Sequence, residues 1–182
     1  MGSTYFGKTS LLLNRQKEWP NWHLPSPYPN CLKNQDLFYP DWFVGLWEVE
    51  STDLNVPDSE TQVHLAKFIY DDSFALIADR KFNAKSIGKA ILGDELIDIK
   101  NDPSSSNRQI ALFKGGGFLD SKVITRNQNS NRENTFYSDE IAFHIFHQSN
   151  QVRINRVEIL SKYKICSNTK MSYFDNRKPI CG

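Results

Sequence analysis

The chain has 182 residues, enough for one domain whose core needs neither a metal nor a disulfide to fold. Its 22 basic and 21 acidic residues leave a net charge of +1, so the composition gives no reason to expect a nucleic-acid partner. No apolar run approaches the ~20 residues that a membrane-spanning helix needs, and no secretory signal is recognisable.

Residues 1–38 read as a polar, aromatic arm. The three prolines of Trp19–Pro27 exclude a long helix or a central strand, so we expect this segment to lie over a domain surface with its rings as anchors. A short helix is predicted over Leu11–Trp19. Gly2–Thr9 matches the phosphate-binding loop letter for letter, but only Met1 precedes it, so the buried strand that must deliver such a loop is missing.

The first strands are predicted directly after this arm. Gly45–Ser51 alternates between two sets of side chains, which is typical of a strand, and Gly45-x-Trp47 follows an aromatic approach. Val63–Tyr70 and Ser73–Ala78 flank Asp71-Asp72, which predicts a tight hairpin.

One helix is predicted over Phe82–Leu92, where apolar residues recur at helical spacing. Asn83 is the expected N-terminal cap and Gly93 the expected stop. Arg80 and Asn83 could present donors to an acid group. Alternatively, Asn83 is only a cap, and Asp79 with Arg80 is a solvated pair.

Short strands and turn residues alternate through the second half of the chain. We expect strands over Glu95–Ile99, Arg108–Lys114, Phe118–Thr125, Thr135–Gln148 and Gln151–Ile165. The segments between them are a loop over Asp102–Asn107, a glycine turn at 115–117, a mobile stretch over Asn127–Asn134 and a turn at Ser149-Asn150. This spacing predicts an all-β fold with one short helix, an antiparallel β-barrel of about 8–10 strands. The barrel domain would span residues 39–166, with a tail over 167–182.

No residue set places a catalytic or metal site. His144 and His147 lie three apart on a predicted strand and therefore face opposite sides, so they cannot share a metal. Asp139-Glu140 is most simply part of a turn. Cys166 and Cys181 could close a disulfide loop, or the three cysteines, with Cys31, are unrelated thiols. We therefore expect no catalytic residues, no metal and no cofactor.

The last long strand carries an irregular pattern. Its apolar residues change face near Arg156, so either a bulge lies there or polar residues point into the barrel. One structural use of Arg156 is to stack over Trp47 at the closed end of the barrel. A cluster at Asn107-Arg108-Gln109 either binds an anion or satisfies loop carbonyls.

Gly45-Leu46-Trp47 resembles the first-strand motif of the calycins, the group that holds lipocalins and fatty-acid-binding proteins. Residues 11–165 also resemble an uncharacterised cyanobacterial and chloroplast family, through Tyr39–Val49, Asp79–Ala84 and Val157–Tyr163. That resemblance implies a photosynthetic source and the thylakoid lumen or periplasm, with the cytoplasm as the alternative. It supplies no catalytic residues.

The function expected from these features is non-catalytic binding of a small apolar or amphipathic ligand, such as a pigment, lipid or isoprenoid. The alternatives are a scaffold or assembly factor of a photosynthetic protein complex, docked through the aromatic arm, and an enzyme such as a bilin lyase or isomerase. The expected ligand-binding residues of the barrel interior are Trp47, Val49, Leu65, Phe68, Arg108, Ile110, Leu112, Phe143, Ile145 and Arg156.

Overall fold

The computed structural model describes residues 36–51, 60–130, 135–165 and 180–181. One sheet contains β1 (Gly45–Ser51), β2 (Gln62–Tyr70) and β3 (Leu76–Ala78) in that order. The other runs β4 (Leu96–Asp102), β5 (Ser105–Phe113), β6 (Phe118–Ser130), β7 (Thr135–Gln148), β8 (Gln151–Ile165) and β9 (Ile180–Cys181). The helix expected over Leu11–Trp19, the phosphate-loop match, Cys31 and Cys166 lie outside the described residues.

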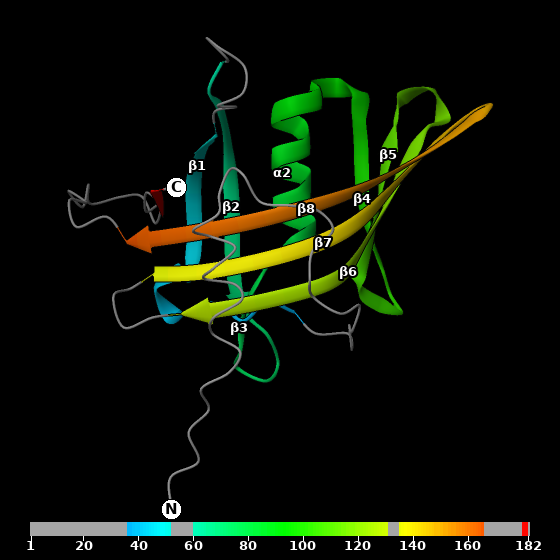
Figure 1. Cartoon of the computed structure of the whole chain (residues 1–182). Helices are drawn as coiled ribbons and strands as arrows, with labels where there is room; N and C mark the ends of the chain where they lie inside the picture. Colours follow the sequence, from blue (N-terminus) through cyan, green and yellow to red (C-terminus); the bar gives the residue numbers. More distant parts are fainter. Residues whose placement is uncertain (1–35, 52–59, 131–134, 166–179, 182) are drawn as a thin grey trace, which may run out of the picture.

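The structure confirms an antiparallel all-β fold with one helix. That helix, α2 (Arg80–Leu92), contacts both β2 and β4 and so stands between the two sheets. The strand ladders of the described ranges do not join into one closed cylinder. Instead, β6, β7 and β8 sweep across α2 and the three-stranded sheet (Figure 1). In these ranges no helix has the length and apolar character needed to cross a membrane.

Helix α2 takes the place of a strand beside β2. The Asn83 side chain accepts a hydrogen bond from the Lys67 backbone N–H at 2.6 Å and donates one to the Lys67 carbonyl at 3.1 Å. Ser86 Oγ accepts from the Leu65 N–H at 2.8 Å. These polar side chains bond to backbone groups of β2 before Phe68, where β3 does not pair with it, and the Asp79 N–H also donates to the Lys67 carbonyl. The helix can therefore lie where the sheet would need another strand.

A capping side chain sets the start of α2, and a glycine with positive φ sets its end. The N-terminal cap is Asp79, whose carboxylate accepts from the Phe82 N–H, so the expected cap at Asn83 is wrong. Gly93 ends the helix at φ +55°, as expected of a glycine stop. Gly88 faces β4 so closely that a Cβ there would lie 2.6 Å from Leu96 Cδ2. A glycine at this point lets the helix approach the strand.

An aromatic core fills the end of the fold near β1. Phe43 and Trp47 are buried together with Phe68, Leu76 and Phe136, from both sheets. Trp47 is 4% exposed, and its indole N–H donates to the Phe43 carbonyl at 2.6 Å. The burial expected of this indole is confirmed, and its polar atom finds a backbone partner.

Several strands are longer than the sequence indicates. β6 continues to Ser130, so 127–130 form a strand where a mobile stretch was expected. The loop expected over Asp102–Asn107 reduces to a turn at Pro103-Ser104, because β4 and β5 pair up to Asp102 and Ser105. Asp139 and Glu140 lie in the middle of β7 and not in a turn.

Candidate functional site

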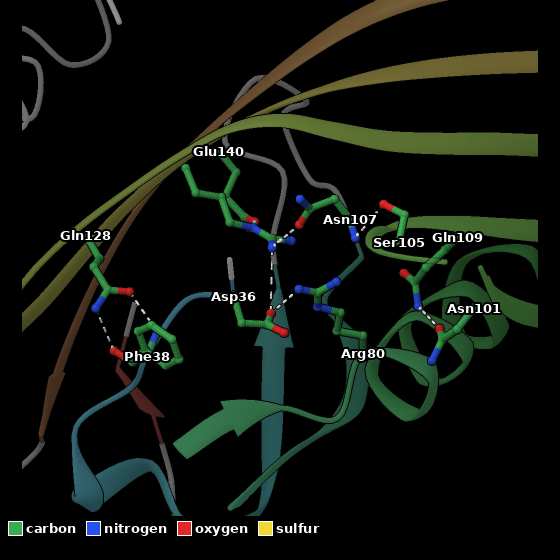
Figure 2. A network of polar contacts seen from close by, with 10 residues as sticks. Asp36, Phe38, Arg80, Asn101, Ser105, Asn107, Gln109, Gln128 and Glu140 are labelled. Atoms are coloured by element: carbon green, nitrogen blue, oxygen red, sulfur yellow. Dashed lines mark hydrogen bonds and ion pairs between the residues drawn. The ribbon is translucent and has the colours of Figure 1, made fainter. Parts of the chain in front are cut away.

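Five polar residues, which we call the Arg126 network, join three parts of the fold. Arg126 of β6 donates to Glu140 of β7 at 2.5 Å and to Asn107 of β5 at 2.6 Å. Its guanidinium also lies 3.6 Å from Asp36, which pairs with Arg80 at the start of α2 (Figure 2). The network therefore links the segment before β1, the helix and the large sheet.

The Arg126 network holds two cations against two carboxylates. The Arg126 side chain is only 8% exposed, so its charge needs these partners. Burial, followed by the nearby Arg126 charge, lowers the pKa of Arg80. Because the four charges balance and each arginine already meets carboxylates, the arrangement serves to hold the fold together.

A neighbouring contact holds the chain before β1 against β6. Gln128 accepts from the Phe38 N–H at 2.7 Å and donates to the Phe38 carbonyl at 3.1 Å (Figure 2). Leu37, one residue earlier, is buried. Asp36, Leu37 and Phe38, which were expected to belong to the arm, are thus attached to the β domain.

Strand register decides which residues face the aromatic core. The β7–β8 pairing runs without a shift from Thr135 to Gln148, so side chains alternate strictly between two faces. We call the face that carries Phe136 and Glu140 the inner face and the opposite one the outer face. Tyr163 of β8 lies opposite Phe136 and therefore also belongs to the inner face.

Six expected ligand-binding residues lie together, but on the outer face. The partners opposite one another across β5, β6, β7 and β8 share a face. This alternation places Phe143 and Ile145 opposite in direction to Phe136 and away from the aromatic core, on a face where Phe143 is 38% exposed and Ile141 is fully buried. The outer face so defined carries Arg108, Ile110, Leu112, Phe143, Ile145 and Arg156.

Neither of the two structural explanations expected for Arg156, a bulge or stacking on Trp47, agrees with the structure. No register shift occurs along β7–β8, so the change of face in β8 is not caused by a bulge there. The Arg156 side chain is exposed on the outer face, opposite Phe143, whereas Trp47 is buried in the inner core. Stacking of Arg156 on Trp47 was therefore a wrong expectation.

The other four expected residues belong to the small sheet. Trp47 and Phe68 are core residues that pack against other side chains. Val49 is half-buried on the same face as Trp47, opposite His64, whose pKa is lowered by burial. Leu65 lies one position out of phase with these residues, beside α2.

A hollow of about 770 Å³ opens at the far end of the large sheet. We call it the terminal hollow. It lies between the end of α2, the β5–β6 turn and the β7–β8 turn, and none of the ten expected residues lines it. Its main lining residues are Leu92, Phe113, Lys114, Phe118, Phe146 and His147.

The chemistry of the terminal hollow is mixed. Phe118 stacks on His147 with ring centroids 4.2 Å apart and planes 12° from parallel, which gives a flat aromatic wall. Leu92 is left 43% exposed beside it. Lys114, Gln148 and Gln151 supply polar groups at the rim. Concave apolar walls with a few polar groups are typical of sites for small molecules.

The sequence reasoning missed this hollow because its residues lie at turns. The signal that could have found it is the placement of aromatic residues beside turn residues: Phe113 and Phe118 flank the glycines at 115–117, and Phe146 precedes the Ser149-Asn150 turn. His144 and His147 lie on opposite faces of β7, as expected, and no cluster able to hold a metal occurs within the described ranges.

The comparisons with known proteins add a family and no activity. The family described as domain of unknown function (DUF6816) matches residues 32–177 of this chain. No curated protein and no solved structure matches this chain. The site geometry therefore has to carry the functional argument.

Proposed function

We propose that this chain, which belongs to the DUF6816 family, binds a small apolar or amphipathic molecule in the terminal hollow, without catalysis. The observation that carries the proposal is a hollow of about 770 Å³ with three phenylalanines and Leu92 in its wall. Ligand sites commonly measure roughly 300–1,000 Å³.

The distribution of groups in the hollow favours an amphipathic ligand. Phe113, Phe118 and Phe146 offer apolar surface for a chain or ring system. Lys114 carries a charge at the rim, and His147 stacks against Phe118, so a polar head group would find partners there. Pigments, lipids and isoprenoids have this combination of a long apolar body and few polar atoms.

The setting is part of the proposal. The resemblance of Tyr39–Val49 and Asp79–Ala84 to a cyanobacterial and chloroplast family is the reason to place the ligand in a photosynthetic cell. The lipid and pigment extract of such cells is therefore the mixture from which the protein should select its ligand.

Leu92→Trp should fill the hollow and prevent binding. We expect native mass spectrometry to detect a bound lipid or pigment on the wild-type protein after incubation with the extract. The larger indole should reduce the bound fraction about ten-fold because ligand and side chain compete for one space. The readout is the mass and the amount of the retained molecule.

Ile97→Trp is the matched control. Ile97 is 54% exposed and does not line the hollow, so this variant adds the same indole nearby and should retain the ligand. Circular dichroism of both variants verifies their folding. Equal retention by the two variants, or no retained molecule on the wild-type protein, would contradict the proposal.

A further inference from the structure

The start of β8 exposes apolar side chains next to the terminal hollow. Val152 is 62% exposed and Ile154 is 63% exposed, and both lie on the outer face. Ile154 is opposite Ile145, and Phe143, two residues before Ile145, is also exposed. Contiguous exposed apolar side chains on a soluble domain mark an interaction surface.

The charges around this surface are mainly positive. On the outer face of β8 the exposed Arg156 follows Ile154, and Glu158 beyond it is half-buried, whereas Arg153 lies opposite Phe146 and so points to the inner face. Lys122, opposite Phe143, is exposed on the same face. The acids of that face in β4–β6 are paired: Asp98 with Lys85, and Asp102 and Asp120 with Arg108. The cations that are not paired in this way make the surface complementary to an anionic partner.

The same surface is continuous with the rim of the terminal hollow. His147 lines the hollow and lies opposite Val152, and Gln151 at the rim precedes Val152 in the chain. The start of β8 projects at the end of the sheet (Figure 1). Whatever covers Val152 and Ile154 therefore also lies beside the opening.

We infer that this end of the protein docks on an anionic lipid surface, with Val152 and Ile154 entering the boundary between head groups and acyl chains. Arg156 and Lys122, which flank Phe143 on the neighbouring strands, then lie at the level of the phosphates. Exposed aliphatic residues flanked by basic ones are the combination that interfacial membrane binding uses. A lipid surface suits this patch better than an acidic protein, because Lys122 and Arg156 stand beside exposed aliphatic side chains, which acyl chains cover and carboxylates do not.

The docking has a functional consequence that rests on the proposed function. An amphipathic ligand could pass between the membrane and the hollow without crossing water, since the rim residues lie against the lipid. The docking itself needs only the outer-face residues. It can be tested whether or not the hollow holds a ligand.

Vesicle flotation with the full chain tests the inference. The wild-type protein should float with vesicles of equal parts phosphatidylglycerol and phosphatidylcholine, less at high salt, and remain free with phosphatidylcholine alone. V152D/I154D should lose most of this binding. K122Q/R156Q should weaken it by about five-fold for each charge removed.

V63D/I69D is the matched control, because Val63 and Ile69 of β2 are exposed apolar residues away from this end. It should float like the wild-type protein. Thermal unfolding of each variant verifies its folding, and ligand retention by V152D/I154D without vesicles should be unchanged. Loss of retention with intact flotation in L92W separates the hollow from the docking surface.

Two results would overturn the inference. The first is equal flotation of the wild-type protein and V152D/I154D on anionic vesicles. The second is the absence of flotation together with a concentration-dependent dimer that V152D/I154D abolishes in sedimentation velocity, which would assign the patch to a second copy of this chain.

Discussion

Arg126 is a cation held almost wholly inside the protein, at the point where Glu140, Asn107 and Asp36 converge. Its removal would leave two carboxylates near one another with a single remaining partner, Arg80. We predict that Arg126→Met lowers the free energy of unfolding by about 3 kcal/mol, because breaking a buried pair leaves an uncompensated charge. Chemical denaturation monitored by circular dichroism measures this change.

The double variant R126M/E140Q is the control for this prediction. Neutralising Glu140 removes the charge that the first substitution leaves unpaired, so the double variant should be more stable than R126M alone. If the unfolding free energies lost in R126M and in E140Q simply add in the double variant, the two side chains act independently, which would contradict the network.

The burial of a single residue could be predicted from the sequence where the size and polarity of its own side chain determine it. Trp47 is large and apolar, and it follows the glycine that starts β1, so its burial could be predicted. Its hydrogen-bond partner, the Phe43 carbonyl, could not, because that depends on the 3₁₀ turn η1 (Asp41–Phe43). The Arg126 network joins residues from five separate segments, and no spacing in the chain indicates it.

At the scale of elements, α2 closes the edge of β2 through side chains. We predict that Asn83→Ala lowers the free energy of unfolding by about 2 kcal/mol, even though alanine favours helices, because the Lys67 N–H loses its acceptor, while the Lys67 carbonyl keeps only the Asp79 N–H. Hydrogen exchange should report a faster Lys67 amide.

Lys81→Ala, at an exposed position of the first helical turn, is the matched control and should leave that amide unchanged. An Asn83→Ala protein with wild-type stability and a protected Lys67 amide would mean that α2 does not stand in for a strand.

The element boundaries show which local signals are strong. Gly93 could be predicted as the helix stop, because few other residues adopt a positive φ there. The cap was expected at Asn83, but Asp79, four residues earlier, caps the helix, because both residue types suit that position and the helix starts earlier than its apolar pattern indicates. The strands β4, β5 and β6 run further than expected because pairing with neighbours extends polar segments that have little strand propensity.

At the scale of the whole molecule, alternation indicates which residues share a face but not which face is inside. The residues Arg108, Ile110, Leu112, Phe143 and Ile145 do share one face, as their spacing indicates. That face is the one opposite Phe136, Glu140 and their partners, and its exposure varies along β7 from the fully buried Ile141 to the exposed Phe143. Contacts with α2 and with the segment before β1 determine which face of the large sheet is packed, and these contacts are not local in sequence.

The proposed function depends most on the terminal hollow being the binding site. Titration of the ¹⁵N-labelled protein with the amphipathic probe 1-anilinonaphthalene-8-sulfonate, followed by NMR, tests this directly. We predict that the shifted amides cluster at Phe113–Phe118 and Phe146–Gln151, whereas those of Trp47 and Phe68 in the packed core stay in place. Shifts centred on Trp47 and Phe68, with the turns unaffected, would contradict the account.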